Sequence, residues 1–474
     1  MSGGRFRPLA GVLAATAVAL TGTRVSAIAL PWYVLGTTGS AAWTGVVAFA
    51  EMVPYVLVKA LTGPLVDRVG PRRISLAADV VSAVAAGAVV LLDALGALPL
   101  GALIALVVVI GAGRGPGDLA KEIMIPEAAG RAGMPLERAT GLMGVTERLA
   151  QTVGPAAGGA VVGLFGALPS LGLSAVFFAL GSMVVGLALP RGMGHSAPAP
   201  ADKLGSGSGS GSAPEFGSGS GSESESGERV TPAPRRGAGS EEGYWRRFGE
   251  GMAFLRGEPL LLTVIAMVCV TNLLDAAFGQ VLGPVWAKES GHGPVLLGLC
   301  GSVMGLTAVG GSLVAAAVAH RLPRRPVLFA AFLIAGPPRF LFLAFDLPVV
   351  AIVAVFAVGG FCGGFLNPIL GAVSFERVPR HLLGRVGGLQ TSLSHVGVPL
   401  GGLLAGAAVT VAGLAPVLLA CGAAYVLALG LTGLRPEWRE MDRLRARPAT
   451  ARPTADGPVS DGSSGAEGRV GVRE

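Results

Sequence analysis

Residues 63–73 read GPLVDRVGPRR, and a long apolar segment flanks them on each side, at residues 43–66 and 74–95. Each segment supplies the roughly 20 mostly apolar residues that a helix needs to cross the hydrocarbon core of a bilayer. The stretch itself carries one aspartate and three arginines, side chains that are costly inside a membrane and collect at its faces. The sequence here therefore predicts two membrane helices joined by a short charged turn.

The composition of the whole chain agrees with this reading. Of its 474 residues, 51% are hydrophobic and only 14% are charged, and the mean hydropathy is +0.65. A soluble domain keeps about 25% charged residues to cover its surface. The deficit indicates that lipid covers most of the surface of this protein. The 75 glycines suit membrane helices whose backbones pack closely together.

Outward from residues 63–73, the same apolar pattern predicts an all-α membrane protein with twelve transmembrane helices in two pseudo-symmetric six-helix bundles. The first six spans are expected at residues 9–36, 43–66, 74–95, 97–119, 138–165 and 167–189. The second six are expected at residues 260–287, 294–319, 326–345, 347–373, 385–412 and 414–434.

The spans divide the chain into four parts. Residues 1–190 are expected to form the N-terminal bundle and residues 259–435 the C-terminal bundle. Residues 191–258, rich in Gly and Ser, are expected to be a largely disordered cytoplasmic linker with an interfacial helix near its end. Residues 436–474 are expected to be a disordered cytoplasmic tail.

The basic residues between the spans predict the orientation of the chain. One set of loops holds most of the arginines, and we assign Lys121 to this set, whereas the alternate loops hold one basic residue, Lys288. Cytoplasmic loops carry the excess of Lys and Arg in membrane proteins. We therefore expect both termini and the central linker to be cytoplasmic, with the chain in a bacterial plasma membrane.

An internal repeat relates the two halves. The pairs that match at a shift of 253 residues, without a gap, are Pro31 and Pro284, Gly45 and Gly298, Arg68 and Arg321, and Arg72 and Arg325. The pairs that match at a shift of 243 residues are Gly154 and Gly397, Gly158 and Gly401, and Gly159 and Gly402. Repeated halves joined by a long loop are typical of transporters that rock around a site near the middle of the membrane.

The charged turn resembles the loop signature of the major facilitator superfamily, G-x-x-x-D-R-x-G-R-[RK]. The residues that carry the resemblance are Gly63, Asp67, Arg68, Gly70, Arg72 and Arg73. In that family the cluster latches the cytoplasmic side while the transporter faces outward, so the resemblance implies a gating role. Pro71 departs from the usual Arg, and the second copy has His320 in place of the acid. We therefore expect weaker latching by the second copy.

A second motif lies in the fifth span, where Gly154, Pro155, Gly158 and Gly159 resemble the antiporter signature of the same family, with Ala150 replacing its first Gly. A proline and small residues give a kinked helix that packs closely on a neighbour. The signature is associated with exporters. Looser matches at residues 29–35 and 251–260 resemble the macrolide-efflux and siderophore-exporter branches.

Ionisable side chains inside the spans are functional candidates, because a charge in the membrane is costly. We expect Glu51 and Asp275 to carry protons, because a carboxylate can change its charge as its surroundings change. The resemblance implies that spans one, four, seven and ten line the cavity. The remaining candidates for substrate contact or counter-charge are therefore Arg24, Arg114, Asp118 and Asn272.

One alternative remains open at these positions. Each charged residue can instead belong to a fixed ion pair that holds helices together. Arg114 and Asp118 are four residues apart and share a helix face, so they are candidates for such a pair. Asp79, Lys59 and Arg148 are interpreted as structural or interfacial residues, and His395 as a polar packing contact.

These patterns predict a proton-coupled exporter of a small lipophilic compound, working by alternating access. The alternatives are a uniporter or symporter for uptake and, in another class, a non-transporting sensor on the same fold. The chain has no H-E-x-x-H, G-x-S-x-G or P-loop motif, and its net charge of +7 forms no basic stripe with aromatics. We therefore expect no enzyme activity, cofactor, metal or nucleic acid. The expected partners are substrate, protons and lipid, with the protein as a monomer.

Overall fold

The computed structural model describes residues 3–190, 193, 249–318, 321–379, 382–435 and 438, and its regular structure in these ranges is helical throughout. Most of the expected linker and tail, including the aromatic residues 244–248 of the expected interfacial helix, lie outside the described residues. Residues 249–256 are helical and lead into the second half of the chain.

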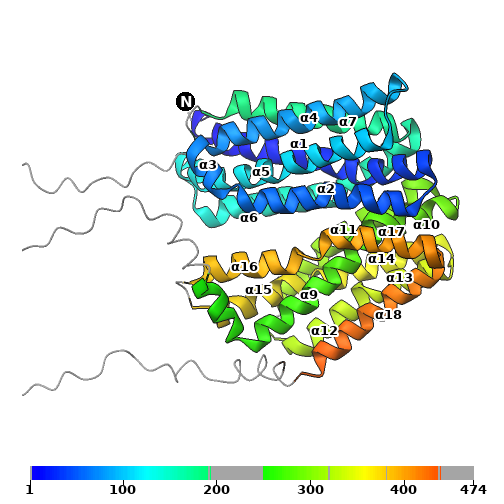
Figure 1. Cartoon of the computed structure of the whole chain (residues 1–474). Helices are drawn as coiled ribbons and strands as arrows, with labels where there is room; N and C mark the ends of the chain where they lie inside the picture. Colours follow the sequence, from blue (N-terminus) through cyan, green and yellow to red (C-terminus); the bar gives the residue numbers. More distant parts are fainter. Residues whose placement is uncertain are drawn as a thin grey trace, which may run out of the picture.

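The first half forms one bundle of long, nearly parallel and antiparallel helices (Figure 1). Its helices are α1 (Gly3–Thr38), α2 (Ala41–Leu61), the short α3 (Gly63–Val69), α4 (Pro71–Ala94), α5 (Leu100–Ala132), α6 (Leu136–Phe165) and α7 (Ala167–Ala188). The expected second span ends earlier than predicted, at Leu61, because Thr62, Gly63 and Pro64 interrupt it and start α3.

The second half forms the other bundle, and several of its spans are built from two helices. Its helices are α9 (Pro259–Ala277), the π-helical turn η1 (Phe278–Leu282), α10 (Gly283–Glu289), α11 (Gly293–Val318), α12 (Arg324–Ala335), α13 (Pro337–Ala344), α14 (Val349–Gly363), α15 (Leu366–Arg377), α16 (Leu383–His395), α17 (Val398–Ala412) and α18 (Leu414–Gly433). The breaks fall at Gly336–Pro337, Gly364 and Gly397, where Gly or Pro weakens the helical hydrogen bonding.

Eleven helical segments of the described chain are long and apolar enough to cross a membrane. The predicted fifth span, α6, is missing from this set because Arg138, Glu147 and Arg148 lower its hydropathy. However, α6 has the length of a span, lies alongside the other helices (Figure 1), and packs against α1 and α11. We count it as the twelfth span. The predicted fold class, an all-α membrane protein with two six-helix bundles, is confirmed.

One boundary error has a chemical consequence. The fourth span was predicted to end at residue 119, with Lys121 in a cytoplasmic loop, but α5 continues to Ala132. Lys121 is therefore inside a helix, and its side chain is only 2% exposed. The prediction was wrong because basic residues usually mark cytoplasmic loops, whereas Lys121 is paired with Asp79 inside the bundle.

The two bundles touch through glycines at the end of the molecule where α1 ends and α2 begins, called here the far end. A Cβ added to Gly159 would lie 2.5 Å from the carbonyl oxygen of Pro294 and 3.0 Å from the Cα of Gly298. At the other contact, a Cβ on Gly45 would overlap the carbonyl oxygen of Gly402. Only glycine allows backbones to approach this closely.

The repeat found in the sequence explains why there are two such contacts. Gly298 is the copy of Gly45, and Gly402 is the copy of Gly159, so the α2–α17 contact and the α11–α6 contact are equivalent. Between them, Lys288 Nζ donates a hydrogen bond to the carbonyl oxygen of Leu35, 253 positions earlier. Residue 288 thus bonds to its own repeat position in the other bundle, as expected near a two-fold axis.

Candidate functional site

A cavity of about 570 Å³ lies between the two bundles. Its wall from the N-terminal bundle is made by α1 and α6, and its other wall by helices of the C-terminal bundle. At the far end the glycine contacts hold the bundles together. Away from that end, the lining reaches Arg148 on α6 and Leu370 on α15. The cavity therefore faces the end of the molecule where α1 begins and α18 ends, called here the termini end.

The wall of the C-terminal bundle is aromatic. Phe278, Phe332, Phe356 and Tyr425 line the cavity. Beneath them the guanidinium of Arg339 lies over two rings, 5.0 Å from the centre of Phe278 and 5.1 Å from the centre of Phe340. This arrangement offers a broad apolar surface that rests on a buried positive charge.

Asp275 pairs with the buried Arg339. The two side chains form an ion pair in which Arg339 is 8% exposed and Asp275 is 44% exposed. Both side chains line the cavity, and the carboxylate is the more exposed of the two. On the same helix, α9, the Nδ2 of Asn272 donates to the backbone oxygen of Ser394 at 2.9 Å, which ties α9 to α16.

Glu51 forms the corresponding pair in the N-terminal bundle. Its carboxylate binds Arg114 of α5, and both side chains are 10% exposed. The guanidinium of Arg114 also lies 5.3 Å from the ring centre of Tyr55. The hydroxyl of Tyr55 donates to Asp118 Oδ2 at 3.3 Å. The expected pairing of Arg114 with Asp118 is therefore wrong: Arg114 binds across to α2, and Asp118 accepts from a tyrosine instead.

A second cavity, of about 260 Å³, lies beside the Glu51–Arg114 pair. Both bundles contribute to it, because Gly279 and Gln280 of η1 line it together with Glu51 and Arg114. Arg24 lines this cavity and also the central one. The surroundings of the Glu51–Arg114 pair therefore depend on how the two bundles lie relative to each other.

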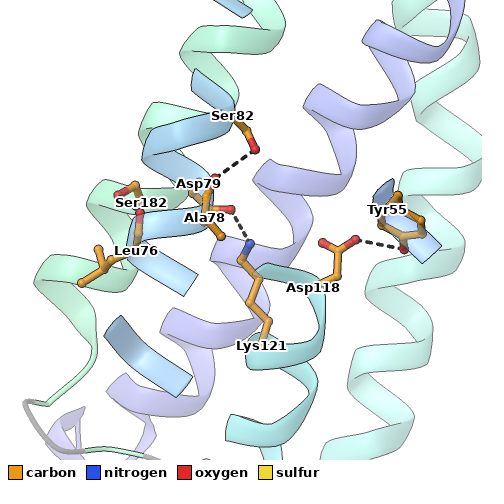
Figure 2. A network of polar contacts seen from close by, with 8 residues as sticks. All are labelled: Tyr55, Leu76, Ala78, Asp79, Ser82, Asp118, Lys121 and Ser182. Atoms are coloured by element: carbon orange, nitrogen blue, oxygen red, sulfur yellow. Dashed lines mark hydrogen bonds and ion pairs between the residues drawn. The ribbon is translucent and has the colours of Figure 1, made fainter. Parts of the chain in front are cut away.

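Asp79 and Lys121 form a third pair, buried within the N-terminal bundle (Figure 2). Lys121 Nζ lies 2.8 Å from Asp79 Oδ1, and the two side chains are 2% and 6% exposed, respectively. The other carboxylate oxygen of Asp79 has no hydrogen-bond partner. Figure 2 shows that Lys121 and Asp118 leave α5 in different directions, so this pair is separate from the Tyr55–Asp118 contact.

Sequence reasoning missed the Asp79–Lys121 pair. The two residues are 42 positions apart, and Lys121 had been assigned to a loop. The usable signal was the run of glycines at positions 111, 113, 115 and 117, which continues the helical small-residue pattern into Lys121. A Cβ on Gly117 would lie 3.3 Å from Asp79 Oδ1, and Gly113 also faces α4, so these two glycines bring α4 and α5 close enough for the pair to form.

The predicted antiporter motif on α6 makes two kinds of contact. Gly154 and Gly158 face α1, where a Cβ on Gly154 would lie 2.6 Å from the Cβ of Arg24 and 2.7 Å from its Cγ. Gly159 and Pro155 face α11 of the other bundle. The backbone N–H of Ala156 donates to the hydroxyl of Ser302 at 2.8 Å. The motif thus packs α6 against its own bundle and across the bundle interface.

The charged turn also binds within its own bundle. Gly70 adopts a φ of +94°, which favours glycine. Arg72 donates through Nε to Leu189 O at 3.0 Å and through Nη2 to Gly186 O at 2.8 Å, at the end of α7. An arginine at this position satisfies carbonyl groups that have no helical partner and interacts favourably with the helix dipole.

The second copy of the turn makes the equivalent contact. Arg325 Nη2 donates to Gly433 O at 3.0 Å, at the end of α18. In the first copy Arg68 and Arg73 are exposed, and the side chain of Asp67 lies outside what the structure describes. His320 also lies outside the described residues. The gating role of the turn therefore remains an expectation.

The structure brings some of the predicted site residues together and separates others. Arg24, Asn272 and Asp275 line the central cavity, and Arg24, Glu51 and Arg114 line the smaller one. Asp118 lines neither of these cavities. Arg148, interpreted from the sequence as structural, lines the central cavity. Within the described ranges no group of His, Cys, Asp and Glu is arranged to hold a metal ion.

Comparison with known families matches both halves of the chain. Residues 260–456 match the Major Facilitator Superfamily, and residues 5–208 match the family described as Transmembrane secretion effector. The Multidrug efflux pump Tap of Mycobacterium tuberculosis is 32% identical over 438 residues, which cover 91% of this chain and 94% of the relative. Its namesake in Mycolicibacterium fortuitum is 28% identical over 442 residues, covering 92% and 97%.

Solved structures support the fold alone, because their identities are low. The nucleoside transporter NupG has a TM-score of 0.62 at 13% identity, covering 91% of this chain and 98% of its own. The POT family transporter PepTSo has a TM-score of 0.62 at 11% identity, covering 92% and 98%. A bacterial homologue of the human lysosomal transporter Spinster, inward-facing and unoccupied, has a TM-score of 0.60 at 14% identity, covering 94% and 99%.

Proposed function

Because this chain belongs to the major facilitator superfamily, we propose that it is a drug efflux transporter that exports small lipophilic compounds in exchange for protons. The observation that carries the proposal is the similarity to a relative named a multidrug efflux pump. The two chains are 32% identical over a region that covers 94% of the relative. The similarity runs through both bundles, so the whole transport unit is shared.

The central cavity supports a lipophilic substrate. Its volume of about 570 Å³ falls in the range of sites for small organic ligands, roughly 300–1,000 Å³. The aromatic wall offers flat apolar contacts without many fixed hydrogen-bond partners, so it places few demands on the shape of a ligand. The efflux-pump relative favours transport over catalysis and sensing, the alternative classes.

The two cavity-facing carboxylates support proton coupling. Glu51 and Asp275 each form an ion pair with an arginine, and protonation of the carboxylate breaks the pair. Glu51 lies beside a cavity built by both bundles, so movement of the bundles changes its access to water. This is the linkage that an antiporter needs: proton binding and bundle position depend on each other. A uniporter or symporter uses the same cavity without this exchange.

The orientation follows from the basic loops. The turn with Arg68, Arg72 and Arg73 lies at the termini end, and the positive-inside rule assigns that end to the cytoplasm of a bacterial cell. With this orientation the central cavity faces inward, ready to take a compound from the cytoplasm. We propose that both termini are cytoplasmic and that the monomer, surrounded by lipid, is the working unit.

The test is transport by purified protein in proteoliposomes with an imposed pH gradient. Wild type is expected to move protons when a lipophilic substrate is added. Glu51→Gln and Asp275→Asn, which keep the shape of each side chain, are expected to lower substrate-dependent proton movement at least tenfold, since neither amide binds a proton. Asp346→Asn, at an exposed position in the far-end loop, serves as the control with unchanged coupling.

Two outcomes would contradict the proposal. Proton-independent transport in wild type and in both variants would make the carboxylates structural and favour a facilitator. Failure of a broad panel of lipophilic compounds to move at all, by folded protein, would overturn the assignment as an efflux transporter.

A further inference from the structure

Two arginines on the N-terminal wall of the central cavity form no ion pair within the described residues, although Asp118 and Glu147 lie near enough to attract Arg24. Arg24 and Arg148 both line the cavity, and among the described residues neither side chain forms an ion pair or a hydrogen bond. The Nε of Arg24 is fully buried and unpaired. Burying a guanidinium in a membrane span without a hydrogen-bonded partner costs free energy. A bound ligand can supply that partner.

The remaining charges on the cavity lining do not neutralise these arginines. Asp275, the one carboxylate among the described lining residues, already binds Arg339. Glu147 is next to Arg148 on α6 but is not part of the lining. With three arginines and one carboxylate, the lining has an excess of two positive charges.

The exporter-like motif fixes the position of Arg24. The Cβ and Cγ of Arg24 pack directly on Gly154. A Cβ added at position 154 would lie only 2.6 Å from the Cβ of Arg24. Gly154 and Arg148 are six residues apart on α6, roughly 9 Å along the helix axis. Gln151, between them, lines the cavity too and adds an amide donor. The two guanidinium groups and this amide thus share one wall.

The opposite wall has the complementary character. Phe278, Phe332, Phe356 and Tyr425 give it an aromatic surface, and its carboxylate is neutralised by Arg339. A ligand that fits both walls has an apolar, flat body and one acidic group. Guanidinium groups bind carboxylates and sulfonates through charge-assisted hydrogen bonds, which are stronger than neutral ones.

We propose that the substrates of this transporter carry an acidic group, a carboxylate or sulfonate, which binds between Arg24 and Arg148 while the apolar body lies on the aromatic wall. This inference rests on the proposed export function and names its substrate class. It also gives the glycine at position 154 a role in binding: it leaves room for Arg24 to point along the cavity wall.

Arg24 also provides a connection between substrate and proton. It lines the smaller cavity together with Arg114 and Glu51. An anion bound to Arg24 therefore lies beside the Glu51–Arg114 pair. The substrate site and the candidate proton site then share one side chain.

The test is equilibrium binding to the full-length protein in nanodiscs, after subtraction of empty nanodiscs. The probes are 8-anilinonaphthalene-1-sulfonate and N-phenyl-1-naphthylamine, which share the same aromatic body and differ in the sulfonate. Wild type is expected to bind the sulfonate at least tenfold more tightly. Arg24→Gln and Arg148→Gln are each expected to lower this ratio by about tenfold or more, since each removes a charge-assisted contact.

Three further variants separate an anion site from a packing role. Arg24→Lys keeps the charge and is expected to retain part of the preference, whereas Gly154→Ala displaces Arg24 and is expected to reduce it. Arg131→Gln, at an exposed pair with Glu127 on α5, is the control with an unchanged ratio. Melting temperatures of all variants identify any that fail to fold.

Each outcome decides a different statement. The acidic subsite is overturned if wild type binds the two probes with equal affinity, or if the arginine variants lose affinity for both probes equally. Neither result bears on the export function, which the transport assay tests separately. Binding of neither probe by folded wild type counts against the lipophilic cavity itself, and so against both proposals.

Discussion

The two bundles are copies in architecture and differ in what fills them. The N-terminal bundle buries the pairs Glu51–Arg114 and Asp79–Lys121. At the shift of 253 residues that relates the halves, Glu51 corresponds to Met304 and Asp79 to Phe332. The C-terminal bundle keeps one cavity-facing pair, Asp275–Arg339, and surrounds it with aromatic rings.

The difference separates two requirements of a transporter. Backbone contacts are retained in both halves: the glycine contacts at the far end and the arginines that bind the ends of α7 and α18 have equivalents. Side-chain chemistry has diverged, with ionisable groups mainly in one half and apolar ligand surface mainly in the other. The ion pairs of one half and the aromatic ligand surface of the other can therefore be altered separately.

The largest effect is expected from breaking the buried pair of the N-terminal bundle. Asp79→Ala leaves Lys121 charged and unpaired and should destabilise the protein by about 3–5 kcal/mol. The measurement is thermal or denaturant unfolding of purified protein in mild detergent. Replacing both residues, Asp79→Leu with Lys121→Met, should recover most of the loss, because no lone charge remains.

Phe332 occupies the repeat position of Asp79, so Phe332→Leu is the matched control for the buried pair. It removes part of one apolar side chain and should cost about 1–2 kcal/mol. If Asp79→Ala costs no more than Phe332→Leu, the N-terminal bundle does not depend on its buried charges, and the comparison between the halves loses its energetic basis.

An intermediate effect is expected at the glycine contacts, which sharpen the similarity of the bundles. Gly45→Val and Gly298→Val each place side-chain carbons against backbone of the other bundle and should force the far end apart. We expect at least a tenfold loss of transport and a shift toward the outward-facing state. Distances between spin labels at Leu164 and Val411, exposed near the far end on different bundles, should increase.

The equivalence of the two contacts makes this test strict. Both variants should lengthen the label distance alike, in a background where the native cysteines are replaced by alanine. Gly87→Val on α4, where an added Cβ meets nothing within 4 Å, is the control. A severe effect at one contact with none at the other would show that one of them alone holds the far end.

The smallest effect is expected from the aromatic rings around Arg339. Phe278→Leu removes one cation–π contact and part of the ligand surface, and should raise the substrate KM about two- to fivefold. In the N-terminal bundle, Tyr55→Phe keeps the ring beside Arg114 and removes only the hydroxyl that contacts Asp118. Initial rates should show a change in KM of less than about twofold for Tyr55→Phe. A larger rise in KM would mean that the aromatic ligand surface extends into the N-terminal bundle.

The sequence predicted the features that depend on local pattern. The spans, the repeat and the charged turn follow from apolar runs and fixed spacings, and the repeat identifies Gly45 and Gly298 as equivalent positions, which make equivalent contacts in the structure. Pairing of charges was poorly predicted, because it depends on how helices are rotated against one another. Arg114 shares a face with Asp118, yet binds Glu51, 63 positions away. Lys121 was misplaced because a buried lysine looks like a loop residue until its partner is known.

The glycine contacts near the far end also lie at one end of long lever arms. Gly45 and the last residue of α2, Leu61, are 16 residues apart, so that arm of the helix is about 24 Å long at ~1.5 Å per residue. Each degree of rotation at the contact then moves the termini end by roughly 0.4 Å. A small tilt at the glycine contacts therefore produces a much larger change in the width of the opening at the termini end, where the substrate enters.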